Sequence, residues 1–184
     1  MEQKDYKMEI VLKLMEKESY GRELAKLVGT NHMTIIRRLG ELMRMNVLDY
    51  REEGRNKVYF IKSSDEARNY LFMSEYYKLM KILGEYPLLR KIFRELQENE
   101  DIELAVLFGS YAKGLSNKNS DIDIYVETNS KKIKTDLEEK HSKLSVKIGE
   151  YNPNNLLIQE IEKNHVIIKG VERYYEKVGI FKKN

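Results

Sequence analysis

The chain has 184 residues, of which 41% are hydrophobic and 34% charged, which excludes a disordered chain and allows one domain or two small ones. The formal net charge is only +3, so any nucleic-acid interface must be argued from where the cations lie. No apolar run reaches the roughly 18 residues of a membrane helix. The first residues lack an apolar signal core, and the absence of cysteine excludes disulfides and thiolate sites. We therefore expect a cytoplasmic protein without membrane contact.

The first third of the chain predicts helices followed by a β-hairpin. Apolar residues three and four positions apart favour helices, and the alternation after them favours strands. The helices are expected over about 6–17, 21–28 and 31–45, and the hairpin strands over 47–51 and 57–61. Ser19 and Thr30 are the expected N-caps of the second and third helices. Two short helices joined by a glycine turn and followed by a hairpin are the layout of a winged helix-turn-helix.

Short polar and basic side chains gather where a recognition helix and a wing would touch DNA. A recognition helix uses outward residues near its N-terminus for base edges and phosphates, and a wing uses cations at its tip. The helix candidates are Asn31, His32, Thr34, Arg37 and Arg38, and the wing candidates are Arg51, Arg55 and Lys57. The pattern predicts binding to double-stranded DNA. The alternative is a protein-contact or dimerisation module whose arginines form a solvated face.

A long helical stretch follows the hairpin. It covers residues 65–99, with a break near Gly84 to Pro87, because proline disfavours helix in the residue before it. Strand-like and helical runs alternate from Ile102 onward. We predict an α+β protein with a winged helix-turn-helix at 1–62, a linker helix at 63–86 and a second domain at 87–184. The helix over 65–83 is a candidate seam of a homodimer, since winged-helix regulators often bind two half-sites as dimers.

Two carboxylates begin a predicted strand of the second domain. The two-residue period of the strand 121–126 puts Asp121 and Asp123 on one face and Ile122 and Ile124 on the other. Adjacent carboxylates repel each other. A divalent cation such as Mg²⁺, which prefers oxygen ligands, would relieve that repulsion and leave positions for substrate phosphates.

A phosphate-binding pattern precedes the carboxylates. An apolar strand over 104–108 leads into Gly109-Ser110, which opens a short helix. Backbone N–H groups and a hydroxyl at a helix N-terminus bind phosphate oxygens well. Lys113 lies one turn further on, where it could neutralise phosphate charge.

Together these residues resemble the signature of the polymerase-β-like nucleotidyltransferases, most of all the minimal ones of archaea and bacteria. The signature runs through Phe108-Gly109-Ser110, ten intervening residues, and Asp121-Ile122-Asp123-Ile124. The resemblance implies a mixed sheet flanked by helices, with a nucleoside triphosphate held by Gly109 and Ser110 and metal held by Asp121 and Asp123. The implied reaction is nucleotidyl transfer to a protein or nucleic-acid acceptor, with pyrophosphate released. Minimal members often act as antitoxins for small helical toxins, so the resemblance implies a helical toxin as partner.

The N-terminal third carries a second resemblance. The stretch from Arg22 to Leu48 is similar to the winged-helix regulators of microbes. A DNA-binding domain fused to a nucleotidyltransferase domain would suit an antitoxin that represses its own operon, by analogy alone.

One departure from the family concerns a third carboxylate. Active members usually carry it on the next core strand, and alignment with the family puts Lys147 in its place. Glu150 is three residues further on and points to the opposite face unless Gly149 introduces a bulge. A lysine there would pair with Asp121 and Asp123 and compete with a metal. Two interpretations stay open: a weakened nucleotidyltransferase that still binds nucleotide, or a non-enzymatic transcriptional regulator or scaffold with a degenerate domain.

Overall fold

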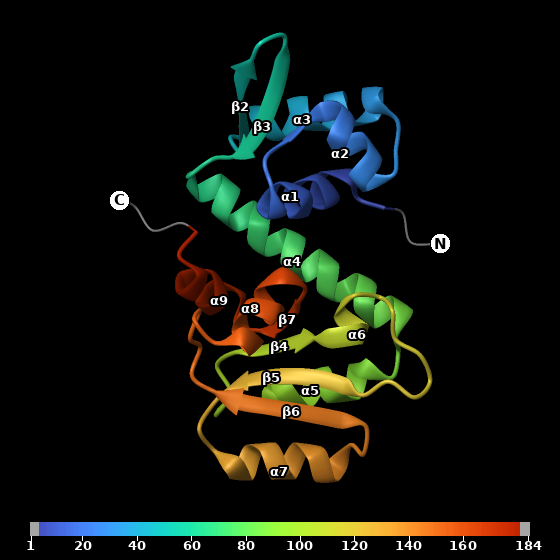
Figure 1. The fold of residues 1–184 in the computed structure, drawn as a ribbon, viewed down its shortest axis with the longest axis vertical. Coiled ribbons are helices and arrows are strands. Elements are labelled where there is room, and N and C mark those ends of the chain that lie inside the picture. Colours follow the sequence, from blue (N-terminus) through green and yellow to red (C-terminus); the bar gives the residue numbers. More distant parts are fainter. Residues whose placement is uncertain (1–3, 181–184) are drawn as a thin grey trace. The chain divides into compact units, whose positions relative to one another are not determined.

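The structure, a computed structural model, describes residues 4–180, which form two compact units (Figure 1). One unit extends to Tyr77 and the other begins at Lys78, so the division falls inside the long helix α4 (Asp65–Glu85). Each unit has its own sheet, and the predicted α+β fold class is confirmed. The predicted domain boundaries near residues 62 and 86 stay predictions. Between residues 4 and 180, no helix combines the length and the apolar character that crossing a membrane requires.

The N-terminal unit has the winged helix-turn-helix layout. Its elements before α4 are α1 (Tyr6–Glu16), β1 (Ser19–Tyr20), α2 (Gly21–Val28), α3 (His32–Arg44), β2 (Leu48–Glu53) and β3 (Asn56–Ile61). The three strands form an antiparallel sheet in the order β1-β3-β2, in which β2 and β3 are the wing hairpin. Ile35, Leu39 and Leu42 of α3 are fully buried, so the opposite side of this helix faces outward.

The two predicted N-caps of this unit are wrong. Ser19 belongs to β1, where it is paired with Tyr59 of the wing, and α2 has no side-chain cap. Asn31 caps α3 in place of Thr30, because its side-chain oxygen accepts a hydrogen bond from the Thr34 backbone N–H at 2.9 Å. Asparagine and threonine both suit this position, and the helix begins one residue later than the sequence pattern suggested.

The C-terminal unit is built around a four-stranded sheet. Its elements after α4 are α5 (Leu89–Glu98), β4 (Ala105–Phe108), α6 (Gly109–Ala112), β5 (Ile122–Glu127), α7 (Lys131–Lys140), β6 (Leu144–Gly149), α8 (Leu156–Lys163), β7 (Val166–Lys169) and α9 (Val171–Val178). The strand order is β6-β5-β4-β7, with β5 and β6 parallel and the other pairs antiparallel. The mixed sheet implied by the family resemblance is therefore confirmed.

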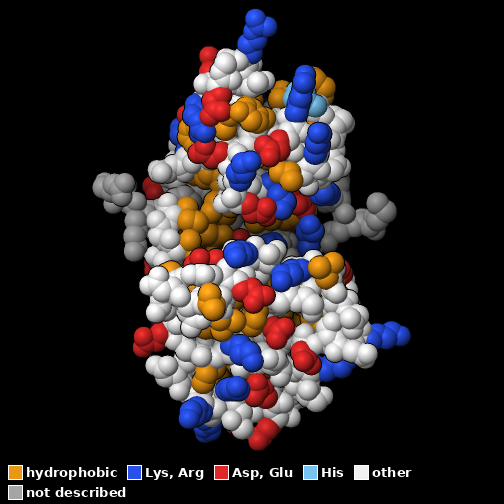
Figure 2. All heavy atoms as spheres, in the orientation of Figure 1, with side chains coloured by type: hydrophobic (Ala, Val, Ile, Leu, Met, Phe, Trp, Pro, Cys, Tyr) orange, Lys and Arg blue, Asp and Glu red, His pale blue; other side chains and the backbone are white. Residues whose placement is uncertain are grey.

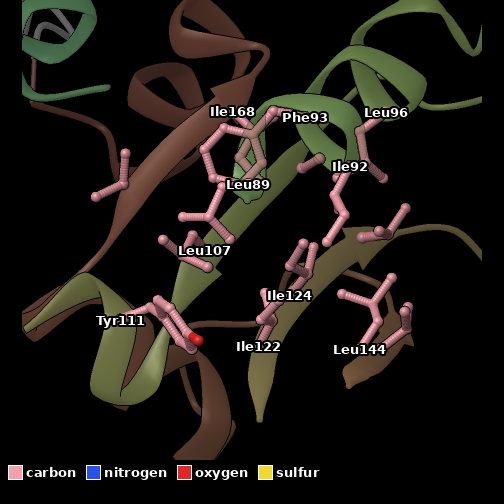
Figure 3. Packing of buried hydrophobic residues seen from close by; sticks show 14 of the residues in the cluster. Leu89, Ile92, Phe93, Leu96, Leu107, Tyr111, Ile122, Ile124, Leu144 and Ile168 are labelled. Carbon is pink, nitrogen blue, oxygen red and sulfur yellow. The ribbon is translucent and has the colours of Figure 1, made fainter. Parts of the chain in front are cut away.

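A single apolar cluster fixes which side of this sheet carries the polar residues. Leu89, Ile92 and Phe93 of α5 share this cluster with Leu107 of β4 and Ile124 of β5. Figure 3 shows Leu89 beside Leu107 and Ile92 directed toward Ile124. Burying side chains of this size contributes about 1.5–3 kcal/mol each. Because Ile122 and Ile124 point into the cluster, Asp123 between them faces the other side of the sheet.

Candidate functional site

The end of β4 and the start of β5 bring a glycine against a carboxylate. Phe108 is paired with Asp123 in the antiparallel register, so Gly109 begins α6 directly beside the Asp123 side chain. Gly109 has a φ of 72°, and a Cβ added there would lie 2.4 Å from the Asp123 Oδ2. Only glycine fits this position, since any side chain would displace the carboxylate and would also be strained at that φ.

Asp123 is half-buried and its charge is only partly compensated. Burial raises the pKa of the Asp123 carboxyl, and the nearby charge of Asp121 raises it further. A hydrogen bond from the Ser145 side chain and the positive charge of Lys147 act in the opposite direction. Asp121 itself is exposed just before β5. A cation between the two carboxylates would remove their mutual repulsion.

Lys147 lies on the same face of the sheet as Asp123. In the parallel register Asp123 is paired with Ser145 and Tyr125 with Lys147, so Lys147 is the diagonal neighbour of Asp123. Leu144 and Val146 point into the apolar cluster on the opposite face. Glu150 follows the residue paired with Glu127, at the far end of β5 from Asp123, so its carboxylate lies away from Asp123.

The residues predicted to hold phosphates lie at the start and end of α6. Ser110 follows Gly109 and is half-buried. Lys113 is more exposed, and its Nζ lies 3.5 Å from the Glu160 Oε1 of α8. The charge of Glu160 also raises the pKa of Asp123, although less than burial and the charge of Asp121 do. An incoming phosphate would compete with this carboxylate for Lys113.

The donor set suits one divalent ion held together with phosphates. Asp121 and Asp123 offer carboxylate oxygens on one face, and Mg²⁺ is typically bound by one or two carboxylates plus substrate phosphates. Within residues 4–180, no group of three or more histidine, cysteine, aspartate or glutamate side chains is arranged to hold a metal. Lys147 shares the sheet face of Asp123, so the neighbouring charged group there is a cation and not a further acid.

The DNA-binding candidates on α3 differ in their exposure and in whether their side chains already form hydrogen bonds within the unit. Asn31 uses its side-chain oxygen to cap the helix, and Thr34 is half-buried behind it. His32 and Arg37 are exposed. Arg38 donates from Nη1 to both carboxylate oxygens of Glu41, at 2.9 and 2.8 Å.

The wing candidates divide in the same way. Arg51 forms ion pairs with Glu18 and Glu53. Lys57 lies 3.9 Å above the Tyr50 ring, and a side-chain hydrogen bond with Tyr50 raises the pKa of its ammonium group. Arg55 is exposed at the tip. Figure 2 shows acids interspersed with Lys and Arg over the visible face of this unit rather than an all-basic surface.

Sequence reasoning missed two residues that influence the pKa of Asp123, Ser145 and Glu160. Ser145 could have been found, because it precedes Lys147 by two positions and therefore shares its strand face. Glu160 carried no signal, since it lies on α8 and nothing in the spacing shows where that helix packs.

Part of the C-terminal unit matches known proteins in sequence. Residues 90–173 match the family model for polymerase beta nucleotidyltransferases. A segment of 49 residues is 49% identical to a protein of Methanocaldococcus jannaschii provisionally named a protein adenylyltransferase. The segment covers 26% of this chain and 57% of that relative, so the match spans little more than half of the relative's length.

Solved structures give weaker likenesses. The adhesin competence repressor AdcR of Streptococcus pyogenes aligns at 13% identity and a TM-score of 0.41, over 49% of this chain and 68% of its own. The PcaV transcriptional regulator of Streptomyces coelicolor aligns at 18% identity and a TM-score of 0.38, over 51% and 74%. A toxin–antitoxin structure with AMP-PNP aligns at 20% identity and a TM-score of 0.34, over 57% and 85%. These TM-scores lie below 0.5, so the winged-helix assignment follows from the strand order and helix layout alone. Residues 90–173 of the C-terminal unit thus match the model of the polymerase beta nucleotidyltransferase family, and the unit before it has the winged helix-turn-helix fold.

Proposed function

We propose that the C-terminal unit binds a nucleoside triphosphate beside Gly109 and Asp123. The observation that carries the proposal is the approach of the Gly109 backbone to the Asp123 carboxylate, within a domain of the nucleotidyltransferase family. Gly109 and Ser110 would hold phosphate oxygens through backbone and hydroxyl donors. Lys113 would leave Glu160 and neutralise part of the phosphate charge.

Asp121 and Asp123 would hold Mg²⁺. When bound, this ion would neutralise part of the phosphate charge. Lys147 supplies a fixed positive charge on the same face. The chain's own residues therefore combine two negative and two positive groups around the phosphates, Lys113 being the second cation. Such a set favours nucleotide binding, but it lacks a further acid to assist the attacking hydroxyl.

The reaction we propose is slow transfer of a nucleotidyl group. An acceptor oxygen forms a bond to the α-phosphorus while the bond to pyrophosphate breaks, and the hydroxyl proton passes to solvent. The relative from Methanocaldococcus jannaschii carries the name of a protein adenylyltransferase, so ATP and a protein acceptor are the first candidates. The second candidate function is a non-enzymatic nucleotide-responsive regulator, which the position of Lys147 favours.

Calorimetric titration tests the binding step without knowledge of the acceptor. ATP, GTP, CTP and UTP are titrated with and without Mg²⁺ into the wild type and into the double variant Asp121→Asn/Asp123→Asn. Asp136→Asn/Glu139→Gln removes two exposed charges of α7 and serves as the matched control. We expect Mg²⁺-dependent binding of ATP that the first double variant loses and the control keeps. Absence of binding to all four nucleotides would exclude the proposal.

Transfer is measured separately with ATP labelled at the α-phosphate. Incorporation into the chain itself or into an added protein, lost in Asp121→Asn/Asp123→Asn, would support the enzyme. Nucleotide binding with no incorporation over hours would leave the non-enzymatic regulator as the better account. A rate near 1 s⁻¹, ordinary for enzymes, would contradict a weakened site.

We also propose that the N-terminal unit binds double-stranded DNA. The outward side of α3 and the wing tip present His32, Arg37, Arg55 and Lys57 as exposed polar and cationic groups. Duplex binding should weaken steeply with salt, because phosphate contacts release counterions. Anisotropy of a labelled duplex tests this directly, and unchanged affinity between 50 and 200 mM salt (about the range over which phosphate-dominated binding collapses) would contradict it. A homodimer and a helical toxin partner stay predictions.

A further inference from the structure

Lys147 is a cation with no partner beside the candidate nucleotide site. Its side chain is exposed, and in the part of the chain that the structure describes it forms no ion pair and no side-chain hydrogen bond. Arg173 and Lys177, further along the same side of the sheet, are instead both paired with the Glu127 carboxylate, at 2.8 and 2.6 Å. Lys147 is therefore available to an anionic ligand.

The strand order places Lys147 on the side of Asp123 from which an acceptor would attack. β5 carries Asp123 and lies between β4, which ends at Gly109, and β6, which carries Lys147. A triphosphate held at Gly109 would extend toward α6, so pyrophosphate would leave on the β4 side. Because the attacking and leaving oxygens are roughly in line in such a displacement, the acceptor would approach from the β6 side.

The residues of β6 on this face are unsuited to activating a hydroxyl. They are Ser145, Lys147 and Gly149. An ammonium group has three donors and no acceptor, and the Ser145 hydroxyl already donates to Asp123. A hydroxyl acceptor reacts slowly without a base to take its proton. A phosphate monoester carries a charge of about −1.5 to −2 at pH 7, so it needs no base and is attracted by a lysine.

A cavity of about 370 Å³ continues this face beyond Lys147. Gly149 lines it two residues further along β6, a distance of roughly 7 Å, and Asn129 and Glu150 line it as well. Asn129 and Glu150 are exposed, and among residues 4–180 neither side chain has a hydrogen bond or an ion pair. An amide and a carboxylate both bind hydroxyl groups. The volume lies within the range of about 300–1,000 Å³ typical of small-molecule sites.

We infer that the preferred acceptor of this site is a phosphate monoester with a hydroxyl-bearing body, such as a sugar phosphate, whose phosphate is bound by Lys147. The inference rests on the proposed nucleotidyl transfer and names the acceptor class that the site uses faster than a hydroxyl. An oxygen of the monoester forms a bond to the α-phosphorus, and the bond from the α-phosphorus to pyrophosphate breaks, with its electron pair leaving on pyrophosphate. No proton has to be removed. The product carries the nucleotidyl group in a diphosphate linkage.

Calorimetry tests the acceptor site on the full chain saturated with Mg²⁺ and α,β-methylene ATP, an analogue that cannot release pyrophosphate. Ribose 5-phosphate is compared with ribose, and a phosphoserine peptide is compared with its serine form, because a phosphorylated protein would offer the same group. The variants are Lys147→Gln, which removes the charge, and Lys147→Arg, which keeps it. Lys140→Gln removes an exposed charge at the end of α7 and is the matched control. Circular dichroism checks that each variant is folded.

We expect ribose 5-phosphate to bind and ribose to show no binding. Lys147→Gln should weaken ribose 5-phosphate about tenfold or more, because a charge-assisted hydrogen bond to phosphate is lost. Lys147→Arg and Lys140→Gln should stay within about threefold of the wild type. Binding of the phosphoserine peptide without binding of ribose 5-phosphate would overturn the sugar-phosphate class.

Transfer from ATP labelled at the α-phosphate gives the second readout. Ribose 5-phosphate should accept the label at least about tenfold faster than ribose, the ratio that 1.4 kcal/mol of barrier gives, and phosphorus NMR should show a diphosphate linkage in the product. Equal affinity or equal rates for ribose and ribose 5-phosphate, or equal losses in Lys147→Gln and Lys140→Gln, would overturn the inference while leaving nucleotide binding in place. A wild-type chain that binds no ATP would overturn both.

Discussion

The two units bring their candidate functional groups together by different means. In the C-terminal unit the backbone positions them, because the antiparallel register of β4 and β5 places Gly109 next to Asp123. This placement does not depend on the conformation of the surrounding side chains. In the N-terminal unit the cations lie on an open surface, and side-chain partners such as Glu41 decide which arginine is available. Strand register follows from a short motif, whereas the partner of a surface arginine can be near in sequence, as Glu41 is to Arg38, or distant, as Glu18 is from Arg51. The first kind of site is therefore the easier one to predict.

The largest effect is expected where the backbone alone makes the site. Gly109→Ala would add a Cβ 2.4 Å from the Asp123 Oδ2 at a residue whose φ is 72°. The φ alone costs about 1–2 kcal/mol in an L-residue. The displaced carboxylate should in addition weaken Mg²⁺-dependent nucleotide binding at least about tenfold, or 1.4 kcal/mol. Calorimetry and thermal unfolding measure the two effects separately.

Gly114→Ala is the matched control for that substitution. Gly114 has a φ of 66°, but the nearest atom to an added Cβ is the Glu85 Oε1 at 4.0 Å. The control carries the backbone strain without the clash, so it should destabilise the C-terminal unit and leave nucleotide affinity within about twofold. If both variants lost nucleotide binding equally, strain in this region rather than the contact with Asp123 would be the cause.

A smaller effect is expected at Lys147, where the side chain rather than the backbone decides the chemistry. Lys147→Asp would replace the cation that lowers the pKa of Asp123 by a third acid on the same sheet face. We expect the ratio of the ATP affinity with Mg²⁺ to the ATP affinity without it to increase about tenfold. Three neighbouring carboxylates repel one another until a bound cation compensates their charge. Titration of Mg²⁺ at fixed ATP measures the change. Lys140→Asp, at the end of α7, makes the same charge change away from the site, and an equal response there would refute the role of Lys147.

The features that follow from local backbone patterns could be predicted from the sequence, whereas those that depend on distant side chains could not. The alternation of Ile122 and Ile124 with Asp121 and Asp123 fixed the face of β5, and the structure places the isoleucines in the core as that alternation requires. The winged-helix layout was also predicted, since its helices are amphipathic and its hairpin has a clear turn. Glu160 was not predicted, because the packing of α8 depends on tertiary contacts between residues distant in sequence.

The N-caps show the same limit on a local scale. Ser19 has the side chain of a cap, but strand pairing with Tyr59 takes it into β1. Helix α7 (Lys131–Lys140) has Leu137 as its one buried residue, and its weak periodicity gave no distinct prediction. Local patterns therefore predicted the elements with a strong apolar face and failed where long-range pairing or sparse burial determined the outcome.

A still smaller effect concerns the stability cost of the half-buried carboxylate. The folded-state pKa of Asp123 is raised above the ordinary value of 3.8, so the folded chain binds more protons than the unfolded chain just above that pH. Stability is accordingly lost as the pH rises through this window, and the loss persists at pH 7. Asp123→Asn should raise the unfolding midpoint at pH 7 by about 1–2 °C and have no effect near pH 3. Circular dichroism melts of the wild type, this variant and Asp136→Asn measure the difference, and a lower midpoint at pH 7 for Asp123→Asn would contradict it.

The smallest effect is expected at the ion pair of α3, where partner choice rather than backbone sets the role of an arginine. The hydrogen bond from Arg38 is the main cause of the lowered pKa of Glu41, whose ordinary value is 4.5. A lowered carboxyl pKa stabilises the fold above the unfolded value, and that contribution disappears as the pH falls through the folded value. Arg38→Ala should therefore lower the unfolding midpoint at pH 7 by less than about 2 °C and leave it unchanged near pH 3. Arg37→Ala, which removes the neighbouring exposed cation, should leave the pH dependence nearly intact, because Arg37 is the last and weakest cause of the Glu41 shift. If instead Arg38→Ala left stability untouched and weakened duplex binding, Arg38 would belong to the DNA surface, and its ion pair with Glu41 would give way to a phosphate when DNA binds.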